Sequence, residues 1–123
     1  MVNLVNLSLN VLHILGDKPA FLEAFMIEND CAHEKMFSDI SEKIKGLDQG
    51  QGVLILTDIF GATPCNIITK IIQPGKVDAI AGINLSMLIR SINYRHESFD
   101  ALIAKAIQGA IDGIIHIQSN QSC

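Results

Sequence analysis

The 123-residue sequence is poor in the residues that bind nucleic acid. It contains no tryptophan and one tyrosine, so it offers few aromatic rings on which bases could stack. Nine lysines and arginines are scattered along the chain and are outnumbered by thirteen aspartates and glutamates, which gives a formal charge of −4. Without a basic cluster, the sequence predicts no nucleic-acid partner.

Cysteine and long apolar runs are also scarce. Cys31, Cys65 and Cys123 are an odd number with no CxxC spacing, which argues against a disulfide framework or a zinc site and for a reducing compartment. No apolar run approaches the roughly 20 residues that a membrane span needs, and no basic segment precedes the N-terminal apolar residues. We therefore expect a soluble, cytoplasmic protein without direct membrane insertion.

Hydrophobic residues make up 49% of the chain, enough for one domain with a real core over residues 1–123. Apolar spacing predicts helices over residues 6–15, 32–47, 64–72, 85–92 and 99–112, with Asp30, Asn84 and Ser98 as N-caps of the second, fourth and fifth. Apolar runs predict strands over residues 21–27, 52–59, 77–83 and 113–117. This alternation indicates an α/β fold, a three-layer, open and mostly parallel sheet flanked by helices. Its ligands would gather at the carboxyl ends of the strands.

The stretch LTDIFGATPCN, residues 56–66, joins a buried strand to a helix in the layout of an anion site. Thr63 is the expected N-cap and Pro64 the expected first helical residue. The amides of Cys65 and Asn66 would then face the loop, where the positive end of the helix dipole favours a phosphate or a carboxylate. The competing interpretation is an ordinary strand-to-helix turn with a good cap. The turn at residues 82–84 should share this edge of the sheet.

Asp58, at the end of the buried strand, has three possible roles: to orient a catalytic imidazole, to hold a metal, or to accept hydrogen bonds from its own loop. No second carboxylate is spaced to complete a magnesium site, so we expect no metal. The loop lacks the GK[ST] ending of a phosphate-binding loop, and GxGxxG is absent, so no nucleotide cofactor is expected.

A nucleophile for phosphoryl transfer would be a histidine, because imidazole is partly neutral at pH 7. The four histidines are His13, His33, His96 and His116. The pattern puts none of them at the carboxyl end of a central strand beside Asp58. Each is therefore interpreted as a surface or packing residue. Cys65 has no histidine or asparagine partner for nucleophilic catalysis apparent in the sequence.

Three segments together carry a family resemblance: GVLILTDIFGATPCN, VDAIAGINLSMLIR, and the last helix with GIIHI. They resemble the enzyme IIA domain of the mannose and fructose branch of the phosphoenolpyruvate-dependent sugar phosphotransferase system. The resemblance covers the chain from about Asn3 to Ile117. It implies an α/β sheet whose short final strand is exchanged in a homodimer. It also implies a histidine that takes a phosphoryl group from the phosphocarrier protein HPr and passes it to a IIB domain.

The family pattern D-x-x-G-[GA]-[ST]-P-x-N carries specific roles onto this loop by resemblance. Asp58 would orient the active imidazole. The loop and the helix amides would bind the phosphoryl oxygens through Gly61, Ala62, Thr63, Pro64, Cys65 and Asn66.

The sequence departs from the family at its front, where members have an apolar strand ending in a Thr-His-Gly-like turn. The opening MVNLVNLSLNVLHILG matches the helix after that turn, so the strand and its histidine would fall at or before Met1. Three explanations stay open: a start codon placed too late, a sheet closed by residues 2–9 or by a partner chain, or a regulatory relative that binds HPr or IIB without transfer. Phosphotransferase activity of this chain is accordingly left open, with a non-catalytic binding module as the alternative.

Overall fold

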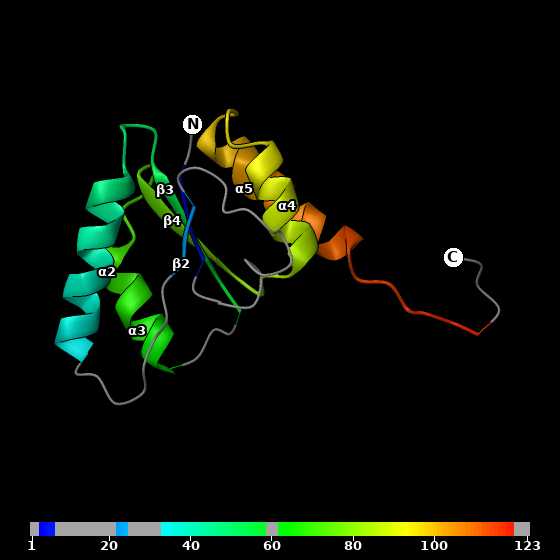
Figure 1. Ribbon diagram of the computed structural model, residues 1–123, viewed down its shortest axis with the longest axis horizontal. Coiled ribbons are helices and arrows are strands. Elements are labelled where there is room, and N and C mark those ends of the chain that lie inside the picture. The colour runs from blue at the N-terminus through cyan, green and yellow to red at the C-terminus, as the bar shows by residue number, and fades with distance from the viewer. Residues whose placement is uncertain (1–2, 7–21, 25–32, 59–61, 120–123) are drawn as a thin grey trace.

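The computed structural model describes residues 3–6, 22–24, 33–58 and 62–119, which form one α/β body (Figure 1). In chain order its elements are β1 (Asn3–Asn6), β2 (Leu22–Ala24), α2 (His33–Leu47), β3 (Val53–Thr57), α3 (Ala62–Ile71), β4 (Val77–Ala81), α4 (Leu85–Asn93) and α5 (Phe99–Asp112). The four described strands are all parallel and lie in the order β2-β1-β3-β4. The expected open parallel sheet between helical layers is confirmed.

The centre of the sheet corrects the expectation that the central strand falls at or before Met1, and it agrees with the explanation in which residues 2–9 close the sheet. Residues Asn3–Asn6, predicted to precede or begin a helix, form β1 instead. Leu4 pairs with Leu22 on one side and with Leu54 on the other, so β1 fills the place between β2 and β3. The physical reason is backbone pairing, because a gap there would leave the facing groups of both neighbours without partners. Beyond Asn6, the predicted helix over residues 6–15 lies outside the described residues, as does the expected N-cap Asp30.

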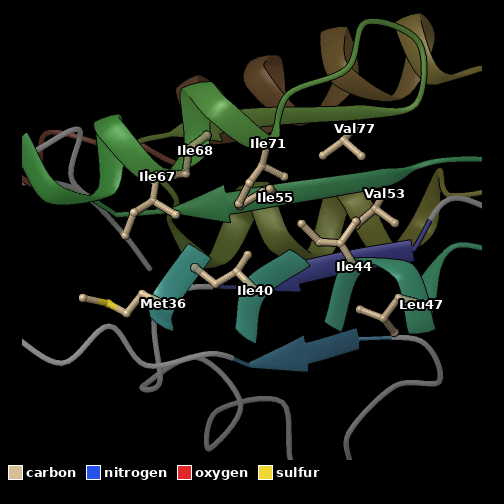
Figure 2. Packing of buried hydrophobic residues seen from close by; sticks show 10 residues of the cluster. All are labelled: Met36, Ile40, Ile44, Leu47, Val53, Ile55, Ile67, Ile68, Ile71 and Val77. Atoms are coloured by element: carbon tan, nitrogen blue, oxygen red, sulfur yellow. The ribbon is translucent and has the colours of Figure 1, made fainter. Parts of the chain in front are cut away.

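Strand β3 is covered on both faces, and its side chains alternate between two cores. Val53 and Ile55 pack under α2 and α3, while Leu54 and Leu56 pack under α4 and α5. All four are fully buried. Figure 2 shows the first core, in which α2 and α3 close over β3 with the buried residues Met36, Ile40, Ile44, Leu47, Val53, Ile55, Ile67, Ile68, Ile71 and Val77. The continuous apolar sequence of this strand follows from burial on two sides rather than one.

The second helical layer begins with the caps that the sequence predicts. The Asn84 side chain accepts a hydrogen bond from the Met87 amide at 2.9 Å, and the Ser98 hydroxyl accepts one from the Ala101 amide at 3.3 Å. The two helices pack closely because α5 presents glycine to α4. A Cβ at Gly109 would lie 2.7 Å from the Cβ of Arg90, and one at Gly113 would collide with the hydroxyl of Ser86.

Residues 114–119 leave the body as an extended trace without strand structure (Figure 1). We call residues 114–118 the tail. Ile114, Ile115 and Ile117 in it are 75%, 68% and 83% exposed. The predicted strand over residues 113–117 is therefore not formed within one copy, and none of the described strands pairs with it. Its exchange in a dimer stays a prediction. In the parts of the chain that are described, no helix combines the length and apolar character of a membrane span.

Candidate functional site

The site is built at the carboxyl ends of β3 and β4. Asp58 follows β3 directly and is exposed, whereas Thr57 before it is buried. The carbonyl of Thr57 accepts two hydrogen bonds, from the amides of Gly82 at 2.8 Å and Ile83 at 3.0 Å. Gly82 reaches this position with φ of +95°, a conformation that favours glycine. The turn after β4 is thus fastened beside Asp58, as the sequence predicts for residues 82–84.

Helix α3 starts earlier than expected, and this changes which amides face the loop. Ala62 is the first helical residue, so Thr63 is not the N-cap and Pro64 is the third helical residue rather than the first. Proline is tolerated there because amides in the first turn have no intrahelical partner to lose. Asn66 is the fifth residue of the helix, where its amide is in position to bond to the carbonyl of Ala62. With these bounds the amides of Ala62 and Thr63, rather than those of Cys65 and Asn66, belong to the first two residues of the helix.

The expected anion loop is described only in part. Gly61 lies outside the described residues, and Ala62, Thr63, Pro64 and Cys65 are placed by their backbone. Asp58 and the start of α3 lie on the same edge of the sheet, because α3 is the helix that follows β3. Their arrangement offers one carboxylate beside the positive end of a ten-residue helix.

Asn84 serves the framework of the site rather than a ligand. While its oxygen caps α4, its Nδ2 donates to the carbonyl of Ala110 in α5 at 2.9 Å. One side chain thus ties the turn beside Asp58 to both helices of the second layer. The spacing of residues in the sequence shows the cap but not the second bond, which spans 26 positions.

Replacing Asn84 by alanine is expected to lower the free energy of unfolding by about 1–3 kcal/mol, because a cap and a second hydrogen bond are lost together. Urea unfolding followed by circular dichroism measures the change. The matched control is Asn93→Ala at the exposed end of α4, expected to stay within about 0.5 kcal/mol of the parent. Equal effects of the two substitutions would contradict the assigned role.

A hollow of about 230 Å³ opens next to the site, between α2 and α3. It is lined by Glu34, Phe37, Asn66, Ile67 and Lys70. Asn66, the last residue of the D-x-x-G-[GA]-[ST]-P-x-N pattern, is exposed into this hollow and not buried in the core. Helix α2 follows β2 and α3 follows β3 in a parallel sheet, so both helices begin at the edge that carries Asp58. Glu34 lies in the first turn of α2.

The histidines divide between different parts of the molecule. His96 lines a shallow hollow with Gln51, which precedes β3 and so marks the opposite, amino edge of the sheet. His116 lies in the exposed tail, and His33 is the first residue of α2, while His13 is outside the described residues. Within the residues that the structure describes, no three histidine, cysteine, aspartate or glutamate side chains group as metal ligands.

Sequence comparison gives the family. The family model of the PTS system fructose IIA component, called EIIA-man, matches residues 8–107. The chain belongs to this family. The match covers Asp58, the start of α3 and the turn at residues 82–84, and it also includes most of α5. The resemblance carried by the loop, the fourth strand and the last helix is therefore confirmed.

Curated relatives agree with the family assignment. The chain is 31% identical over 84 residues to the "PTS system mannose-specific EIIAB component" of Escherichia coli K12 and of Shigella flexneri. The match covers 66% of this chain and 26% of each relative, so the chain spans about a quarter of the length of the proteins it matches.

Solved structures share the fold. The phosphotransferase system component EIIA from Streptococcus agalactiae superposes with a TM-score of 0.79 at 20% identity, covering 94% of this chain and 97% of that one. The mannose/sorbose-specific IIA subunit from Enterococcus faecalis gives 0.78 at 20% identity, with 99% and 98% covered. At these identities the likeness bears on the fold alone.

Proposed function

We propose that this single domain, residues 1–123, is a cytoplasmic IIA component that works with HPr and a IIB domain of the sugar phosphotransferase system. The observation that carries the proposal is Asp58 at the exposed end of β3 beside the start of α3. In a carrier of this family the P–N bond of phospho-HPr breaks and a new P–N bond forms on an imidazole. In a second transfer the P–N bond on this imidazole breaks as the phosphoryl group bonds to its acceptor on IIB. Asp58 would accept a hydrogen bond from that imidazole and hold it in place.

The start of α3 would stabilise the transferred group. The amides of Ala62 and Thr63 belong to the first turn of the helix, where backbone donors lack intrahelical partners. Together with the helix dipole, they favour the charge on phosphoryl oxygens. We assign phosphate binding to Gly61, Ala62, Thr63, Pro64, Cys65 and Asn66, with the amide role at Ala62 and Thr63 and with Asn66 at the rim of the hollow between α2 and α3.

The 123-residue chain itself is proposed not to carry the phosphoryl group beside Asp58. Residues 1–12 contain no histidine, so none follows β1 before His13. His96 lies at the opposite edge of the sheet and His116 in the tail. The surface around Asp58 then serves to bind HPr or IIB without transfer, which makes the alternative function a regulatory binding module.

Incubation with phosphoenolpyruvate, enzyme I and HPr, read on a phosphate-shift gel, tests this proposal. We expect phospho-HPr to form and this chain to stay unmodified. Stoichiometric acid-labile phosphate on the chain would overturn the proposed loss of transfer. His13→Ala and His33→Ala would then locate the acceptor, because His33 begins α2 at the same edge as Asp58.

Calorimetric titration of HPr, and separately of a IIB domain, distinguishes a binding module from an unrelated protein. A module must bind at least one of them although nothing is transferred, and Asp58→Ala should weaken that binding. Asp48→Ala is a charge-matched comparison at the opposite edge of the sheet, in the loop before β3, although its carboxylate also accepts bonds from Gly50 and Gly52. If neither HPr nor the IIB domain binds, the proposal that this chain works with them is rejected.

A homodimer is part of the same proposal. The tail exposes three isoleucines that have no cover in one copy. Addition of the tail to the sheet of a second copy, and of that copy's tail to the first, would bury them symmetrically and pair the backbone of each tail with a strand.

A further inference from the structure

Among the described strands β4 is an edge of the sheet, and its outward-facing groups can be identified residue by residue. The carbonyl of Lys76 accepts from Val53, and the amide of Gly82 donates to Thr57, so the even-numbered residues of this segment face β3. Backbone groups alternate in direction along a strand. The amides and carbonyls of Val77, Ala79 and Ala81 therefore point to the open edge.

The first part of this edge is already occupied. Gln73 forms an antiparallel bridge with Val77, with its amide donating at 3.0 Å and its carbonyl accepting at 2.9 Å. Next along the edge, the amide of Ala79 donates to the Oδ1 of Asp78 at 2.8 Å. The side chain of Asp78 thus takes the place that a carbonyl of an added strand would occupy.

Beyond Ala79 the described residues leave the edge uncovered. Among the described residues, no hydrogen bond is made by the carbonyl of Ala79 or by the outward amide and carbonyl of Ala81. Ala81 is also exposed. Three backbone groups in a row are therefore available to one short incoming segment.

We propose that Asp78 is a gate on this edge: it restricts strand addition to the Ala79–Ala81 end of β4 and weakens the pairing of a tail from a second copy. The inference rests on the proposed homodimer. A strand that extends past Ala81 toward Val77 must first displace the carboxylate from the Ala79 amide. The Ala79 amide already has an acceptor before the strand binds. The incoming strand therefore exchanges one hydrogen bond for another at this amide, and its affinity for the edge is lower.

The occupant is the tail of a second copy, because its length and pattern fit the open segment. Residues 114–118 are five extended residues, and Ile115 and Ile117 fall on one side of a strand while His116 falls on the other. A segment of this size spans the open groups of β4 without reaching the bridge at Gln73. The exposed isoleucines gain cover, and the open groups at Ala79 and Ala81 gain partners.

Replacing Asp78 by alanine removes the carboxylate and frees the Ala79 amide for the incoming tail. We expect the dimer dissociation constant, measured by sedimentation equilibrium on the full chain, to fall about two- to tenfold, the net worth of one hydrogen bond. Urea unfolding of the variant checks that the monomer remains folded. An unchanged dissociation constant would overturn the gate while leaving the dimer in place.

Two controls separate the hydrogen bond from the charge. Asp78→Asn removes the charge but keeps an oxygen acceptor, so its dissociation constant should match the parent. If it matches Asp78→Ala instead, the hydrogen-bond gate is wrong. Asp39→Ala removes the same charge from the exposed face of α2 and should have no effect.

The oligomeric state of the parent chain tests the homodimer on which the proposed gate rests. If the parent and all variants stay monomeric at every concentration, the proposed dimer and the gate both fail. Phosphoryl transfer and HPr binding are measured separately and do not change that result. If the parent is monomeric and Asp78→Ala dimerises, the gate is established in its strongest form.

Discussion

Replacing Ile55 by alanine is expected to lower the free energy of unfolding by about 2–5 kcal/mol. Ile55 is fully buried in the middle of β3, under the core formed with α2 and α3, and it pairs in register with both β1 and β4. The strand is fixed by its neighbours on both sides, so the space left by the side chain cannot close. Against a total stability of about 5–15 kcal/mol for a domain, this is a large share.

Urea unfolding monitored by circular dichroism gives the value for Ile55→Ala. The matched control is Ile111→Ala, the same substitution at a residue of α5 that is 57% exposed, where a change within about 0.5 kcal/mol is expected. If both variants lost the same free energy of unfolding, the burial of Ile55 would not be the cause of its loss. The Asp58 site should also weaken in Ile55→Ala, because β3 holds Asp58 in position.

The double substitution Ile115→Asp with Ile117→Asp is expected to raise the dimer dissociation constant on the order of a hundredfold or more. Each isoleucine that the dimer buries contributes about 1.5–3 kcal/mol, and an aspartate in its place would have to lose its hydration. The unfolding free energy of the monomer should stay unchanged, since both residues are largely exposed in one copy. Sedimentation equilibrium and urea unfolding measure the two quantities.

His116→Asp is the control within the same tail. It introduces the same aspartate on the other side of the strand from Ile115 and Ile117, and it adds one negative charge with histidine counted as neutral, against two in the double substitution. A change within about threefold is expected for this variant. Equal loss of the dimer in His116→Asp would mean that acidic charge in the tail, rather than burial of the isoleucines, controls association.

The sequence predicted the sheet well where the signal was continuous. The apolar run at residues 52–59 identified β3 because a strand buried on both faces needs no polar alternation. Asn84 and Ser98 identified two helix starts because their side chains bond to amides only three residues away. Both signals depend only on residues close together in the chain, so they can be recognised in a single sequence.

The parts that were predicted wrongly depend on neighbours distant in the chain. Asn3–Asn6 is a strand because β2 and β3 pair with it, and the four residues NLVN have no pattern that distinguishes a strand from a helix start. The start of α3 was misplaced by two residues because Thr63-Pro64 imitates a cap followed by a first helical residue. The two bonds to Thr57 and the bond from Asn84 to Ala110 join segments whose spacing carries no motif.

The close packing of α5 on the start of α4 has a mechanical consequence. Asn84 holds Ala110, and Ser86 abuts Gly113, from which the tail departs. The same turn is fastened to the carbonyl of Thr57, one residue before Asp58. We therefore expect that pulling on the tail displaces the turn at residues 82–84 first, and with it the end of β3 that carries Asp58.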